Sequence, residues 1–275
     1  MSALRAATVR DALDSAVIAI TASGSSTPRL DAELLLAHAL GVHRTALFLD
    51  PEREVGGQAA RAFQTLARRR AVEHAPIAYL LGRRAFRRLE LAVDPRVLIP
   101  RPETELLVEV GLELPRGAQV VDVGAGSGAV ALALKDERPD LDIVGTDMSA
   151  DALAVARGNA ARLELEVSFA QGDLLAGFTA EAVLANPPYV PDGDPLPPDI
   201  ARHEPAWALR GGPDGLEVIR RLIPAVAGNG ARLLALEVGA GQAPAVAALA
   251  HEAGFAEVTT RADLAGIERV VVAQR

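Results

Sequence analysis

The sequence predicts an α/β fold, with a doubly wound sheet in residues 101–275, a small helical domain in residues 1–75 and a β-hairpin linker in residues 76–100. Three observations support this. From residue 101 onward, short apolar runs alternate with helical patterns, as parallel βαβ units require. The first domain has apolar side chains at helical spacing. The linker alternates apolar and polar residues, which is typical of a hairpin.

Each element follows from a local pattern. In the first domain, helices are expected at residues 9–20, 29–40, 45–49 and 57–74, separated by Gly, Ser and Pro segments. In the linker, strands are expected at 89–93 and 97–99. The third domain should contain seven strands, near residues 119–123, 142–147, 166–170, 182–186, 231–237, 255–261 and 269–274. The segment 190–213 is too long for a simple connector and is expected to form a lid or substrate channel.

Composition excludes several classes of function. The chain has no cysteine, so disulfides, thiolate metal sites and cysteine nucleophiles are excluded, and its five histidines lack ligand spacing, so no metal is expected. No membrane-spanning run or signal peptide pattern is visible, which predicts a soluble, cytoplasmic protein. A net charge of −8 argues against a general nucleic-acid binder, so no direct DNA binding is expected.

The most informative motif is Asn186-Pro187-Pro188-Tyr189, directly after the apolar run 182–185. Two prolines end the strand, and ligands bind at the carboxyl ends of strands in open α/β sheets. The side-chain carbonyl of Asn186 and a rigid proline carbonyl can accept hydrogen bonds from an NH₂ group, and Tyr189 adds a flat wall. Such a pocket suits a planar amide or an exocyclic amine. Taken alone, the tetrapeptide could equally be an ordinary turn that ends a strand.

A glycine-rich turn follows the strand that ends near Asp122. It comprises Gly124, Ala125, Gly126, Ser127 and Gly128, with glycine at every second position, unlike the dinucleotide-binding fingerprint. The turn resembles the first motif of S-adenosylmethionine (SAM)-dependent methyltransferases. In that motif the bare backbone lets the methionine part of SAM lie close, and the acid, here Asp122, helps to orient its amino group.

Two further strands end in acidic residues. Asp147 lies about 20 residues beyond Gly128, the usual position of a carboxylate that accepts ribose hydroxyls. It could instead cap the next helix, but Ser149 is an equally good cap. After the third strand come Asp173 and Leu174, which in methyltransferases flank the adenine, the acid taking its amino group and the apolar side chain packing on the ring.

Together these sites resemble the HemK-type protein-(glutamine) methyltransferases (PrmC family), which modify peptide chain release factors. The resemblance extends over essentially the whole chain, and includes Val97-Leu98-Ile99-Pro100-Arg101-Pro102-Glu103-Thr104-Glu105, the segments 29–36, 76–80 and 208–212, and Glu204-Pro205. It implies the class I SAM-dependent methyltransferase fold, a Rossmann-like seven-stranded sheet whose last strand is antiparallel.

The resemblance also implies an activity: methyl transfer from SAM to the glutamine amide of the release factor Gly-Gly-Gln motif, with S-adenosylhomocysteine as product. Asn186, Pro187 and Tyr189 would be catalytic, with Pro188 and Phe86 completing the substrate pocket; Asn186 would also contact SAM. Residues 1–75 carry none of the SAM-binding or amide-binding residues, so we expect this helical domain to dock the release factor. A monomer is also expected.

Some alternatives remain open at this stage. The same motif would serve a glutamine methyltransferase of a ribosomal protein, or an adenine-amino methyltransferase acting on nucleic acid, although the acidic balance argues against the latter. A SAM-binding module without catalysis is a further alternative. Arg87-Arg88 departs from the family, which commonly has an aromatic residue after the position of Phe86. Glu103 and Glu105 fit a plain helix start as well as a site role.

Overall fold

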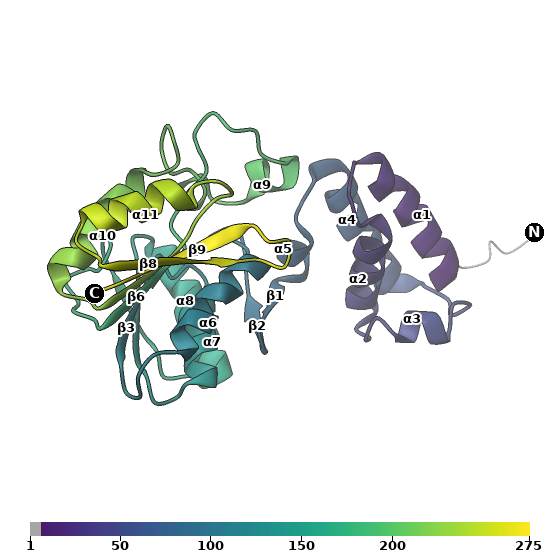
Figure 1. Cartoon of the computed structure of the whole chain (residues 1–275). Coiled ribbons are helices and arrows are strands. Elements are labelled where there is room, and N and C mark those ends of the chain that lie inside the picture. Colours follow the sequence, from purple (N-terminus) through teal and green to yellow (C-terminus); the bar gives the residue numbers. More distant parts are fainter. Residues whose placement is uncertain (1–6) are drawn as a thin grey trace, which may run out of the picture. The chain divides into compact units, whose positions relative to one another are not determined.

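A computed structural model describes residues 7–275, and its chain divides into two compact units. The first comprises Met1–Gly82 and Leu196–His203, and the second comprises Arg83–Pro195 and Glu204–Arg275. Figure 1 shows helices in the first unit, and a sheet with helices on both of its faces in the second. The predicted linker, 76–100, is divided between them, because its first seven residues group with the helices and its hairpin groups with the sheet.

The first unit is helical, as the spacing of its apolar residues predicts. Thr8 begins the first helix with a capping box, in which its hydroxyl accepts from the backbone N–H of Asp11 and the Asp11 carboxylate accepts in return. The apolar faces of the helices form one core around Ile20, Leu35 and Phe63. The helices are α1 (Val9–Ala22), α2 (Pro28–Leu40), α3 (Ala46–Leu49), α4 (Gly57–Glu73), α5 (Ile77–Leu81) and α9 (Pro198–His203).

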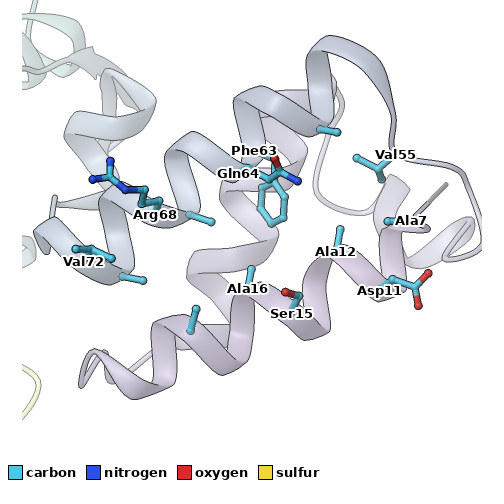
Figure 2. A pocket seen from close by; sticks show the side chains of 14 residues that line it. Ala7, Asp11, Ala12, Ser15, Ala16, Val55, Phe63, Gln64, Arg68 and Val72 are labelled. Atoms are coloured by element: carbon cyan, nitrogen blue, oxygen red, sulfur yellow. The ribbon is translucent and has the colours of Figure 1, made fainter. Parts of the chain in front are cut away.

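A groove of about 430 Å³ lies between α1 and α4 of this unit. Figure 2 shows it lined mostly by small and apolar side chains, among them Ala12, Ala16, Val55 and Phe63. Close-packed helices would leave no such space. The groove is present because the alanines on both helices are too small to fill the gap between them.

The hairpin comprises β1 (Arg83–Phe86) and β2 (Leu89–Ala92), paired antiparallel. The predicted strand at 89–93 is therefore nearly correct, but the predicted second strand at 97–99 is wrong, since the partner of β2 precedes it. After β2, Pro95 lacks an amide donor and the chain turns, with the N–H of Val97 donating to the carbonyl of Asp94. Val97 and Ile99 are buried although they belong to no strand.

The sheet of the second unit has the strand order β5-β4-β3-β6-β7-β9-β8. The first five strands in this order are parallel, and β9 is antiparallel to both of its neighbours. This confirms the predicted seven-stranded sheet with its antiparallel last strand. The strands are β3 (Gln119–Val123), β4 (Asp142–Asp147), β5 (Ser168–Gln171), β6 (Ala182–Ala185), β7 (Leu233–Glu237), β8 (Glu257–Ala262) and β9 (Glu268–Gln274).

Two hydrophobic cores cover the two faces of this sheet. Because successive strand residues point to opposite faces, Val120 and Leu184 belong to one core, whereas Val121 and Val183 belong to the other. Figure 1 shows α6 and α7 on one side of the sheet and α10 and α11 on the other. The helical segments of this unit are η1 (Pro102–Thr104), α6 (Glu105–Leu112), α7 (Ala129–Glu137), α8 (Ala150–Leu163), η2 (Ala206–Ala208), α10 (Glu217–Asn229) and α11 (Ala243–Glu252).

In the long segment between β6 and β7, the chain at Arg210 and Gly211 comes back to lie beside Val190, where the segment began. Val190 forms a parallel bridge with Arg210, and the N–H of Gly211 donates to the carbonyl of Val190 at 2.9 Å. A Cβ at Gly211 would overlap the carbonyl oxygen of Pro188, so only glycine permits this approach. The segment is thus fastened directly to the Asn-Pro-Pro-Tyr motif. Within residues 7–275 no helix is long and apolar enough to cross a membrane.

Candidate active site

The strand order places a crevice at the carboxyl ends of β3, β4 and β6. The chain winds in one direction from β3 to β4 and β5, and in the other direction to β6 and β7. Ligands bind at such a switch point in open α/β sheets. A cavity of about 150 Å³ lies there. Its lining consists of Leu98, Val123, Gly124, Gly126, Thr146, Asp147, Met148, Gly172, Asp173, Leu174, Asn186, Pro187, Pro188, Trp207, Ala208, Val218 and Arg221.

The glycine-rich turn forms one wall of the cavity. Gly124, Gly126 and Gly128 all have positive φ, at 75°, 55° and 83°, which L side chains rarely adopt. The N–H groups of Gly124 and Ala125 donate to the carbonyl of Thr146, at 2.8 and 2.9 Å, and fix the turn against the end of β4. Gly124 and Gly126 line the cavity, whereas Ala125 and Ser127 are buried outside its lining. The turn therefore presents bare backbone to a ligand.

Asp147 ends β4 and lines the cavity, although only 6% of the residue is exposed. One carboxylate oxygen accepts from the N–H of Gly126 at 2.9 Å, and the other accepts from the N–H of Ser149 at 2.8 Å. Burial raises the pKa of Asp147, while these two bonds act in the opposite direction. Each oxygen keeps further lone pairs, so the carboxylate can still accept from two hydroxyls. The helix cap of α8 is Ser149, whose hydroxyl accepts from the N–H of Ala152.

Asp122 does not reach the cavity. It is 2% exposed and accepts from the N–H of Ala131 at 3.1 Å, inside the first turn of α7. Burial raises its pKa to about 7, with the charge of Asp147 acting in the same direction. The structure places Asp122 beneath the glycine turn, where it holds the turn against the helix, and does not bring it to the ligand-facing surface.

The two residues that the sequence predicts beside the adenine, Asp173 and Leu174, both belong to the lining of the cavity. Asp173 forms an ion pair with Arg221 of α10, a residue that the sequence did not single out. Leu174 has φ of 50°, and its carbonyl accepts from the Thr146 hydroxyl at 2.6 Å. The half-exposed ring of Trp207 also lines this cavity and offers a second apolar surface.

Asn186, Pro187 and Pro188 line the cavity directly after β6. The side-chain nitrogen of Asn186 donates to the hydroxyl of Thr104 at 3.1 Å. Its side-chain oxygen makes no hydrogen bond within the described residues. A smaller cavity of about 30 Å³ adjoins the first and shares Leu98, Asn186 and Ala208 with it. Its lining consists of Leu98, Arg101, Asn186, Tyr189, Val190, Ala208 and Leu209.

Tyr189 is held from both ends. Its hydroxyl donates to Glu237 at 3.1 Å, and its backbone carbonyl accepts from the Gln242 side chain at 2.9 Å. Burial, followed by the nearby negative charge of Glu237, raises the pKa of Tyr189. Glu237 itself is 1% exposed, and burial raises its pKa to about 7, against the hydrogen bonds from Thr104 and Tyr189.

Phe86 is not brought to the site. Its side chain is 1% exposed and belongs to the core that includes Leu91 and Leu107, so it walls neither cavity. The basic residues beside it are also engaged. Arg87 pairs with Glu137 at 2.8 Å and Arg88 pairs with Asp136 at 2.9 Å, both on α7. These pairs fasten the hairpin turn to α7.

Glu105 and Arg101 also have structural partners. A carboxylate oxygen of Glu105 accepts from the N–H of Arg87 at 3.1 Å and supports the hairpin turn. Arg101 pairs with buried Glu204 at 2.5 Å, and Glu204 also accepts from the N–H of Ile99 at 3.1 Å. Within residues 7–275, no group of three or more His, Asp or Glu residues could hold a metal ion.

Comparison with known proteins identifies the family. Residues 11–82 match the family described as "PrmC N-terminal domain", and residues 102–198 match "Methyltransferase small domain". A solved methyltransferase from Pyrococcus furiosus is 15% identical, with a TM-score of 0.53 over 78% of this chain and 96% of that chain, and it shows the same fold.

Two curated relatives are similar over nearly their full lengths. The release factor glutamine methyltransferase of Mycolicibacterium smegmatis is 42% identical over 97% of this chain and 98% of that protein. The enzyme of that name from Deinococcus radiodurans is also 42% identical, with the same coverage. The resemblance seen in the sequence motifs is thus confirmed, and the chain belongs to the release factor glutamine methyltransferase family.

Proposed function

We propose that the cavity at the switch point binds SAM, and that the site methylates the side-chain amide of the glutamine in the Gly-Gly-Gln motif of peptide chain release factors. The observation that carries this proposal is the orientation of Asn186. Its side-chain nitrogen is engaged by Thr104, which leaves its carbonyl oxygen as an acceptor at the junction of the two cavities. An incoming NH₂ group needs such an acceptor.

The residues around the larger cavity fit the parts of SAM. Bare backbone at Gly124 and Gly126 leaves room for the methionine part, and Asp147 offers a buried carboxylate to the two ribose hydroxyls. Leu174 and Trp207 offer apolar surfaces to the adenine, and Asp173 offers an acceptor to its amino group. To accept that amino group, Asp173 must weaken or break its ion pair with Arg221. The loss in free energy is small, because the ion pair is exposed to solvent. When bound, SAM supplies the activated methyl group.

The lining of the smaller cavity suits the chemistry of a glutamine side chain. Leu98, Ala208 and Leu209 give it apolar walls, Tyr189 gives it an aromatic wall, and Asn186 lies where it meets the larger cavity. An amide nitrogen is a weak nucleophile, and neither cavity presents a strong base. We propose that Asn186 and the Pro187 carbonyl accept the two amide hydrogens, hold the nitrogen in place and stabilise the positive charge that develops on it.

The helical unit is proposed to dock the release factor. None of the residues that line the two cavities comes from residues 7–82. A glutamine amide is chemically the same in every protein, so the choice of substrate requires contacts outside the pocket. The groove between α1 and α4 offers an apolar surface for such contacts (Figure 2).

The test is transfer of labelled methyl from SAM to a purified release factor, followed by mass spectrometry of the Gly-Gly-Gln peptide. We expect one methyl on the glutamine, and none on a release factor whose motif carries glutamate instead. Asn186→Ala should lower turnover by roughly 10²–10³, the scale for loss of one preorganised group, while SAM affinity changes little.

Asn229→Ala is the matched control. The side chain of Asn229 is likewise held by hydrogen bonds, here to backbone, accepting from the N–H of Ala180 and donating to the carbonyl of Phe178, but it lies outside both cavities. This variant should keep wild-type turnover. Methylation of a ribosomal protein or of adenine in nucleic acid, with an unmodified release factor, would contradict the proposal.

A further inference from the structure

We infer that Thr104 and Glu237 are positioning residues, which fix the end of the Asn186 amide that faces the substrate. The inference deepens the proposed function and rests on it. Neither residue lines the SAM cavity or its smaller neighbour, and both are almost fully buried, with 4% and 1% exposure. They therefore act on the substrate only through the side chains that they hold.

The connections form a short buried chain. The Asn186 side-chain nitrogen donates to the Thr104 hydroxyl at 3.1 Å, and that hydroxyl donates to Oε2 of Glu237 at 2.6 Å. The other oxygen of Glu237 accepts from the Tyr189 hydroxyl at 3.1 Å. One carboxylate thus connects both polar side chains of the Asn-Pro-Pro-Tyr motif.

The sheet brings these groups together. The register of β6 with β7 pairs Ala185 with Leu236. Asn186 directly follows Ala185, and Glu237, the last residue of β7, directly follows Leu236. The register therefore places Asn186 and Glu237 side by side. Thr104 comes from η1, which precedes α6. The register and η1 thus place the side chains of Thr104 and Glu237 beside the motif.

The direction of the hydrogen bonds follows from counting protons. Above about pH 7 Glu237 is ionised. An ionised carboxylate only accepts, so Thr104 must then donate its single hydrogen to Glu237. The Thr104 oxygen is then left with lone pairs alone, and it can satisfy only a donor. The Asn186 amide must consequently turn its NH₂ toward Thr104 and its carbonyl oxygen toward the cavity. In the opposite orientation the NH₂ of Asn186 would face the NH₂ of the substrate, and two donors cannot form a hydrogen bond with each other.

Other bonds hold the backbone of the motif, so this chain is not needed to keep it in place. Gln242 donates to the Tyr189 carbonyl at 2.9 Å, and Gly211 donates to the Val190 carbonyl at 2.9 Å. Loss of the Thr104 hydroxyl removes the constraint on the amide orientation and leaves these bonds intact. The expected effect is therefore on turnover rather than on folding.

The experiment compares Thr104→Val, which keeps the shape but loses the hydroxyl, with Thr104→Ser, which keeps the hydroxyl. Assays use the full chain, a purified release factor and saturating SAM at pH 8. We expect Thr104→Val to lower kcat by roughly 10- to 100-fold, the usual scale for a group that orients another, and Thr104→Ser to stay near wild type. Calorimetry should show SAM affinity within about twofold of wild type for both variants, because neither touches the cavity.

A double-mutant cycle separates positioning from a merely structural role. If Thr104 acts through Asn186, then adding Thr104→Val to Asn186→Ala should lower turnover by less than about twofold further. An equal loss on both backgrounds, or wild-type turnover in Thr104→Val, would overturn the inference.

If Thr104→Val does not fold, Glu237→Gln replaces it as a second variant of the same shape. A glutamine accepts on one side only, so either Thr104 or Tyr189 must reverse its bond, and turnover should fall with SAM affinity retained. Wild-type turnover in Glu237→Gln would also overturn the inference. Wild-type enzyme is measured in the same assay. No methylation of the release factor by the wild type would contradict the proposed function. Wild-type turnover in the variants would contradict only the positioning role.

Discussion

Replacement of Asp147 by alanine tests the proposed SAM site most directly. Asp147 is buried at the end of β4, and each of its carboxylate oxygens already accepts one backbone N–H, from Gly126 and from Ser149. The ribose diol would be held by the remaining lone pairs. Asp147→Ala removes both acceptors without adding a group that fills the cavity.

The magnitude follows from the number of bonds lost. A hydrogen bond to a charged group contributes about 1.5–3 kcal/mol, and two such bonds are removed. Water partly satisfies the freed hydroxyls, so a net loss of about 2–3 kcal/mol is expected. At 1.4 kcal/mol for each factor of ten, the Kd for SAM should rise by about 30- to 150-fold.

Calorimetric titration with SAM and with S-adenosylhomocysteine measures this change, with circular dichroism to verify that the variant folds. The matched control is Asp142→Ala, at the exposed first position of the same strand, which should leave Kd unchanged. If folded Asp147→Ala binds SAM as tightly as the wild type, Asp147 has no role in holding the ribose.

Two further predictions concern Asp122 and the helical groove. Burial raises the pKa of Asp122 from 3.8 in the unfolded chain to about 7, so between these pH values only the folded protein keeps the proton. The free energy of unfolding is therefore highest below pH 3.8 and falls as the pH rises to about 7. Asp122→Asn should therefore gain stability relative to wild type over this range, by up to about 4 kcal/mol in urea unfolding; a difference that is constant with pH would refute this. Ala19→Arg, in the groove, should raise KM for the intact release factor and spare SAM affinity, whereas Ala22→Arg, exposed on α1 but outside the groove, should change neither. Equal KM values for Ala19→Arg and wild type would argue against docking in the groove.

The sequence by itself determined the order of the strands and the residues that end them. Glycine spacing, an acid after the second strand and two prolines after the fourth are local signals, and a parallel sheet brings its carboxyl ends to one edge. That is why the sequence alone predicts Gly126, Asp147 and Asn186 at one site. The structure places all three in the lining of one cavity.

Only the tertiary structure decided how deep each side chain lies and which distant residues support it. The alternation of apolar residues indicates a face of the sheet but not distance from the surface, so Asp122 and Phe86 were expected at the site although both are buried away from it. Thr104 and Glu237 are 133 residues apart, and no local pattern marks either as a partner of the other. Their meeting depends on the register of β6 with β7 and on the packing of η1, because a hydrogen bond between distant segments exists only once both are folded.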